Sequence, residues 1–193
     1  MVRPRFSRKV SPHVVGGALA LVVGLGFASS TLAVNTVSTT VVGGTRTASI
    51  ADAFLGPVPY SHVDTPRSGS LLLTADDSSG TNAGWNVTVL AGAFNYTGTF
   101  GGVAIPAANF TLTSAAAPGH STGQGVSPAQ GPKVPDTLLP PTTLDTPRKV
   151  LHSNPNHGRG TYTQALGVTL VVPADSVEGN YTSLLTVTIA AAP

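Results

Sequence analysis

The sequence contains no cysteine, and this absence removes several functional classes at once. Without thiols the chain cannot form disulfides, bind a metal through thiolates or use a cysteine as a nucleophile. Its fold must therefore be stabilised by an apolar core, and the chain is long enough to build one.

Charged residues are also scarce, and they are unevenly placed. They make up 9% of the chain, and four of the ten basic residues are Arg3, Arg5, Arg8 and Lys9. The remainder has six basic against eight acidic residues, a net charge of −2. Nucleic-acid binding requires a basic stripe, so we expect no nucleic-acid partner.

The N-terminus has the pattern of a secretory signal. The basic start is followed by an apolar run, residues 14–28, and then by the small-residue stretch Thr31-Leu32-Ala33. This order predicts a helical signal peptide over residues 1–33, with cleavage after Ala33. The apolar run is shorter than the ~20 residues that a membrane-spanning helix needs. We therefore expect a secreted chain, residues 34–193, without a membrane span.

No part of residues 34–193 shows a sustained helical period with caps. Short runs rich in β-branched and apolar residues alternate with turn residues instead, and they predict strands. Several short strands without helices favour one domain, an all-β antiparallel β-sandwich. The expected strands are residues 34–49 with a break at Gly43-Gly44, 70–75, 85–89, 94–100 and 110–113.

Two further alternating runs, residues 161–172 and 181–189, flank a short polar stretch, residues 173–180. This arrangement predicts an antiparallel hairpin. Between residues 115 and 158 the chain is rich in proline and glycine, which predicts a mostly extended, exposed loop. Regular structure is expected to resume near residues 149–151.

Gly119-His-Ser-Thr-Gly123 matches the Gly-x-Ser-x-Gly pattern of hydrolase nucleophiles. That motif needs a strand before the serine and a helix after it, and Pro118 and Pro128 argue against both. The histidines lack the spacing of metal ligands, and the loop at residues 76–82 lacks the distal glutamate of a calcium-binding EF-hand. We therefore expect no enzyme activity, no metal and no cofactor.

Trp85 is the one tryptophan, and two interpretations of it remain open. Its flat ring could stack on a sugar and so bind a ligand. Alternatively, it fills the core, because it is in register with Val87 and Val89 on one face of a strand. The register favours the core.

The segment from Leu71 to Val89 with Gly84-Trp85-Asn86-Val87, the stretch Phe110-Thr-Leu-Thr113 and the closing residues 160–189 together resemble the WxL domain, a β-rich bacterial cell-surface module. The resemblance covers roughly residues 34–190. It implies secretion and non-covalent attachment to the cell wall, with peptidoglycan as the suggested ligand and other surface proteins as possible partners.

The chain departs from the family pattern at two points. The first signature is Trp-x-Val instead of Trp-x-Leu, and the second, within residues 185–189, has no tryptophan. An alternative function is a structural or adhesive surface subunit. Such a subunit would self-associate by pairing the hairpin edge or the N-terminal Val/Thr strand with a neighbouring copy.

Overall fold

The computed structural model describes residues 37–192. The expected signal peptide, residues 1–33, lies outside the described residues. Within residues 37–192 the chain forms eleven strands and one short 3-10 helix, η1 (Ala107–Asn109). The fold class predicted from the sequence, an antiparallel all-β structure, is confirmed.

The larger sheet is built around one long strand. This strand, β9, pairs along its whole length with β2, from Thr65 opposite Val172 to Asp77 opposite Gly160. On its other side β9 pairs with β5 and β6. The strands of this sheet are β1 (Arg46–Ile50), β2 (Thr65–Asp77), β5 (Phe110–Ala115), β6 (Gly119–Gly123), β7 (Thr142–Thr143) and β9 (Gly160–Val172).

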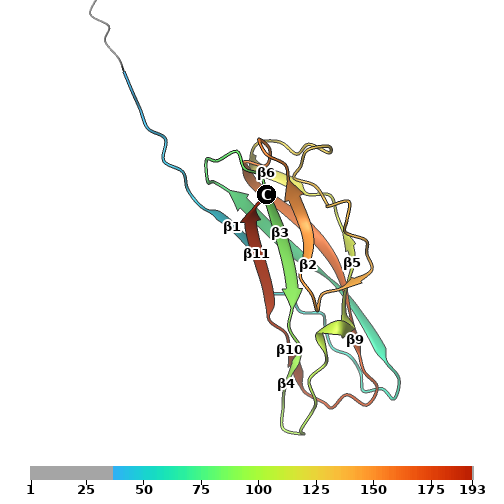
Figure 1. Cartoon of the computed structure of the whole chain (residues 1–193). Coiled ribbons are helices and arrows are strands. Elements are labelled where there is room, and N and C mark those ends of the chain that lie inside the picture. Colours follow the sequence, from blue (N-terminus) through green and yellow to red (C-terminus); the bar gives the residue numbers. More distant parts are fainter. Residues whose placement is uncertain (1–36, 193) are drawn as a thin grey trace, which may run out of the picture. The chain divides into compact units, whose positions relative to one another are not determined.

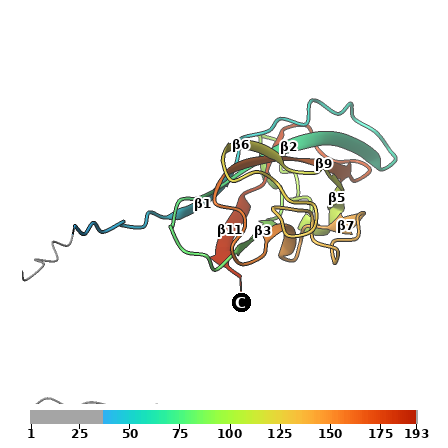
Figure 2. The same cartoon turned by 90° about the horizontal axis from the view of Figure 1, so that it is seen from above.

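A smaller sheet covers the larger one (Figures 1 and 2). Its strand order is β11-β3-β8, and a separate two-stranded ribbon pairs β10 with β4. The bounds are β3 (Trp85–Ala91), β4 (Asn95–Thr97), β8 (Arg148–Ser153), β10 (Asn180–Thr182) and β11 (Leu185–Ala191).

Alternating side chains of both sheets meet in one apolar core. On β3 the buried residues are Trp85, Val87 and Val89, as their alternation predicts. On β9 the alternation from Tyr162 to Leu170 likewise points inward. Period-2 patterning therefore identified the inward face of both strands.

The predicted hairpin is wrong. Residues 161–172 and 181–189 do form strands, but these strands do not pair with each other. Residues 160–172 form β9, whose two sides are occupied by β2 and by β5 and β6, so no edge is left for the C-terminal strand. After residue 172 the chain pairs through β10 with β4 and through β11 with β3. The alternation of apolar and polar residues predicts that a segment forms a strand, but it does not predict which strand it pairs with.

The segment 115–158 also differs from the exposed loop that its composition predicted. It contains β6, β7 and β8, the last of which begins at Arg148, close to the expected return of regular structure. Leu138, Leu144, Val150 and Leu151 from this segment are buried in the core. Apolar residues spaced between the prolines therefore anchor it to the sandwich.

Candidate functional site

Trp85 lies at one end of the sandwich and has no exposed surface. Its indole Nε1 donates a hydrogen bond to the carbonyl of Gly158 at 2.8 Å, and its ring packs against Tyr162, with 6.0 Å between ring centroids. An enclosed indole offers no face to a sugar. The ligand-binding interpretation of Trp85 is therefore not compatible with this structure, and the core interpretation fits it.

Gly158 makes this contact possible. Its φ of 77° is in the left-handed region, which glycine enters without steric cost. A Cβ at this position would collide with the side chain of Ser153 and would lie 2.8 Å from Trp85 Nε1. The loop before β9 can thus approach the indole only because residue 158 is a glycine.

The acidic residues beside this end are used within the fold. Asp77 is buried, and its Oδ1 lies 3.2 Å from Arg46 Nε and accepts the backbone N–H of Ser79 at 3.0 Å. Asp76 accepts hydrogen bonds from Thr161 and Ser78. Among residues 37–192 no group of three or more histidine, cysteine or acidic side chains is placed to hold a metal ion.

The Gly119–Gly123 stretch forms β6, an exposed strand paired with β9. Ser121 therefore lies within a strand instead of at a sharp turn between a strand and a helix. The ring of His120, the residue before it, packs against Tyr162 at 5.9 Å between centroids. Burial raises the pKa of Tyr162, and the Asp77 carboxylate adds to that rise.

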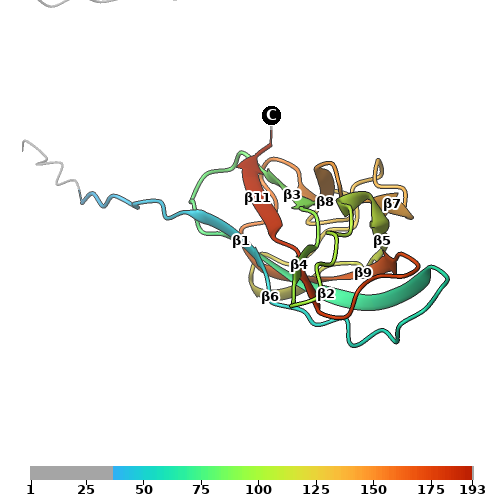
Figure 3. The ribbon, with the colours of Figure 1, turned by 90° about the horizontal axis from the view of Figure 1, so that it is seen from below.

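Toward the opposite end lies a groove of about 1230 Å³, lined by residues of both sheets and of β10. The connection between β1 and β2 and the connection between β9 and β10 both lie at this end (Figures 1 and 3). We call residues 51–64, the first of these connections, the strap. The groove floor consists of the core residues Leu71, Phe94, Ile105, Phe110 and Leu170.

Large apolar side chains on the groove wall face solvent. Phe54 is 87% exposed, and Tyr60 and Leu184 are also mostly exposed. We call these three residues the rim. Arg67, Asp52 and Glu178 also line the groove, and Arg67 Nε donates to the carbonyl of Leu55 in the strap at 2.7 Å. The groove thus combines an apolar floor, an aromatic rim and a few charged groups, which is the usual composition of a ligand site.

The strap is fastened at its far end by three side chains. Asp175 Oδ1 accepts the hydroxyl of Tyr60 at 3.0 Å and lies 2.6 Å from His62 Nδ1. Asp175 has a φ of 56° in the turn after β9. The hydrogen bonds from His62 and Tyr60 lower the pKa of the Asp175 carboxyl, and that carboxylate raises the pKa of Tyr60. We call this group the clasp.

Comparison with known proteins agrees with this β architecture. The family model of the WxL domain, described as a surface cell wall-binding domain, matches residues 29–193. The chain belongs to the WxL domain family. A search of curated proteins and a search of solved structures each found no match.

Both signature stretches of this WxL domain lie in the smaller sheet. Trp85-Asn86-Val87 begins β3 and residues 185–189 begin β11, and the two strands pair with Val87 opposite Ile189. Where the family pattern has a second tryptophan, the inward side chains are Leu185, Val187 and Ile189, all smaller than an indole. Leu185 and Val187 line the groove.

The groove was not predicted from the sequence, because its walls come from segments far apart in the chain. One signal was available. The irregular stretch after β1 carries Phe54 before Pro57 and Tyr60 after Pro59, and aromatic residues in a proline-rich connection indicate a contact surface. Within residues 37–192 no helix is long and apolar enough to cross a membrane.

Proposed function

We propose that this WxL domain is exported and attaches non-covalently to peptidoglycan through the groove end of the sandwich. The observation that carries the proposal is the family match over residues 29–193, because that family is described as surface cell wall-binding. Because the net charge after the first nine residues is −2, the proposed attachment does not depend on attraction to a polyanion.

The rim supplies the contact in this proposal. Phe54 and Tyr60 present aromatic faces, which match the apolar faces of sugar rings, and the nearby polar groups of Asn180 and Ser183 can bond to hydroxyl or amide groups. The Trp85 indole is enclosed and plays no direct part. Peptidoglycan is thus bound by residues of the strap and of the stretch between β9 and β11.

Sedimentation with purified peptidoglycan tests this proposal. The chain should pellet with the polymer, and soluble wall fragments should compete. Phe54→Ala combined with Tyr60→Ala should weaken binding several-fold, because both aromatic faces are removed. Phe100→Ala is the matched control, since Phe100 is 67% exposed but does not line the groove. Equal binding by the rim and control variants would remove the rim from the site, and absence of pelleting would remove peptidoglycan as the ligand.

We also propose that the chain acts by binding and not by catalysis. Ser121, the residue that a hydrolase motif would use, lies in an exposed strand, and no helix follows it in the described part of the chain. The purified protein should not turn over chromogenic esters or glycosides. An esterase activity that disappears in Ser121→Ala would contradict this expectation.

A further inference from the structure

Arg67 is a charged residue on the face of β2 that elsewhere packs against the core. It lies opposite Leu170 in the β2–β9 ladder, and residues directly opposite each other in an antiparallel pair share one face of the sheet. Leu170 is buried in the core and forms part of the groove floor. The Arg67 side chain therefore extends on the groove side of the larger sheet, where it is one of the lining residues.

The inward face of β2 changes its chemistry where the groove begins. Leu71, Leu73 and Ala75 occupy inward positions and are buried. The two inward positions that precede them hold Gly69 and Arg67. An apolar residue at position 67 would have continued the core pattern. Departures from the local pattern are concentrated at functional sites, so this arginine is a candidate for ligand contact.

The strap orients the Arg67 side chain before any ligand arrives. Arg67 Nε donates a hydrogen bond to the carbonyl of Leu55 at 2.7 Å, and Gly56 packs against Nη2. Gly56 has a φ of 87°, in the region that glycine enters without steric cost. A Cβ at this position would collide with the guanidinium. The strap thus uses one nitrogen of Arg67 and fixes where the other two lie.

The two terminal nitrogens of this guanidinium have no acidic partner in the fold. Within residues 37–192 Arg67 forms no ion pair, although Asp52 and Glu178 line the same groove. In that part of the chain its Nη1 and Nη2 atoms donate no hydrogen bond, and the side chain is exposed. An arginine fork of this kind matches a carboxylate, which it binds through two parallel hydrogen bonds.

We propose that Arg67 binds a carboxylate on the peptide stems of peptidoglycan while the rim contacts the sugar strand. This assignment rests on the proposed function, because it names the chemical group that the groove recognises in the same polymer. Phe54 of the rim directly precedes Leu55, whose carbonyl orients Arg67. The aromatic ring and the guanidinium therefore belong to one short stretch of the groove wall, and they can contact adjoining parts of one polymer.

The surroundings of Arg67 strengthen a contact with a carboxylate. Leu170 lies opposite it in the ladder, and Leu55 packs over Gly69 on the same face. Apolar neighbours lower the local dielectric, which strengthens a hydrogen bond between charged groups relative to one in open water. A carboxylate held at this position is therefore favoured over a neutral amide of the same shape.

Chemical amidation of the polymer tests this proposal. Treatment of purified peptidoglycan with a carbodiimide and methylamine converts its carboxylates into neutral amides. The wild-type chain should pellet at least several-fold less with the amidated polymer than with the native one. Arg67→Gln should bind native polymer several-fold more weakly than the wild type does, and it should not distinguish the two polymers. Arg159→Gln is the matched control and should behave as the wild type, since Arg159 is exposed but does not line the groove.

The pattern of losses separates recognition of a carboxylate from other roles. Equal pelleting of the wild-type chain with both polymers would overturn the proposal and leave peptidoglycan binding through the rim intact. An equal loss by Arg67→Gln on both polymers would also overturn it, because Arg67 would then act only by holding the strap. A preference for native polymer that persists in Arg67→Gln would assign the carboxylate to another group. Absence of pelleting with native polymer would overturn both this assignment and the proposed function.

Discussion

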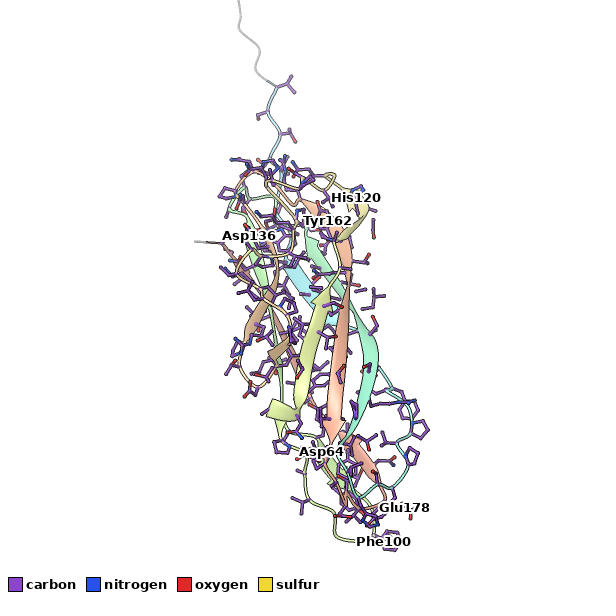
Figure 4. The ribbon with its side chains drawn as sticks, turned by 90° about the vertical axis from the view of Figure 1, so that its right-hand side faces the viewer. Asp64, Phe100, His120, Asp136, Tyr162 and Glu178 are labelled. Carbon is purple, nitrogen blue, oxygen red and sulfur yellow. The ribbon has the colours of Figure 1, made fainter. Side chains whose placement is uncertain are left out.

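At one end of the sandwich Trp85 and Tyr162 are enclosed, whereas at the other end Phe54, Tyr60 and Leu184 face solvent. Figure 4 shows the two ends, with Tyr162 and His120 at one and Asp64, Glu178 and Phe100 at the other. At the enclosed end the side chains of Trp85, Tyr162 and Asp77 make contacts within the fold. At the groove end the large apolar side chains of Phe54 and Leu184 are exposed.

This difference indicates a division of roles. Substitutions at the Trp85 end should reduce stability and affect binding only through unfolding. Substitutions at the rim should reduce binding and leave stability nearly unchanged. The following predictions test that division, beginning with the largest expected effect.

Trp85→Ala should lower the free energy of unfolding by about 3–5 kcal/mol, because it removes a large buried ring and leaves a cavity. It also leaves the Gly158 carbonyl without its 2.8 Å donor. Urea unfolding monitored by circular dichroism measures the loss. Trp85→Phe, which keeps a ring, should cost less. Unchanged stability with abolished wall binding would show instead that the indole contacts the ligand.

Asp77→Ala should destabilise the fold by roughly 2–3 kcal/mol, because it removes a buried partner of Arg46 and the acceptor of Ser79. The matched control is Asp136→Ala, which breaks an exposed ion pair with Lys133 and should cost less than about 1 kcal/mol. Denaturant midpoints of the two variants give the comparison. Equal losses of stability in the two variants would show that burial does not determine how much each ion pair contributes.

Phe54→Ala should change the free energy of unfolding by less than about 0.5 kcal/mol, because an exposed side chain away from caps and buried networks contributes little. The same variant should bind peptidoglycan more weakly, as proposed above. Thermal unfolding and sedimentation of one protein preparation measure both quantities. A large loss of stability would show that the strap is part of the folding core.

The clasp should make a small contribution that depends on pH. The pKa of Asp175 is lowered in the folded state by His62 and Tyr60. The contribution is therefore present above the ordinary aspartate pKa of 3.8 and is lost as the pH falls through the lower folded value. Hydrogen exchange of the strap should increase over that acidic range. In the Asp175→Asn variant the backbone amides of the strap should exchange faster at neutral pH, and their exchange should depend less on pH.

Several elements could be predicted from the sequence because local chemistry sets them. Alternation identified the inward faces of β3 and β9, and the turn residues correctly separated most of the strands. The sequence motifs around Trp85 and in residues 160–189 indicated the WxL domain family, which the comparison then showed. Self-association by the N-terminal strand stays a prediction.

Other features could not be read from the chain. The residues 161–172 and 181–189 looked like a hairpin, but both sides of β9 are taken by strands more than 30 residues away in sequence. The composition of the proline-rich stretch 115–158 predicted an exposed loop, but Leu138, Leu144 and Leu151 of this stretch are buried in the core. The sequence was compatible with both a ligand-binding and a core role for Trp85, and only the structure showed that its side chain is fully buried.

The sequence by itself determined which residues form strands and which side of each strand is apolar, because side chains alternate with a period of two whatever the partner. Only the tertiary structure decided the pairing of those strands, since the hydrogen bonds that join them are not local. It also decided that, within residues 37–192, β1 and β11 are each unpaired along one side. The groove follows from that choice of partners.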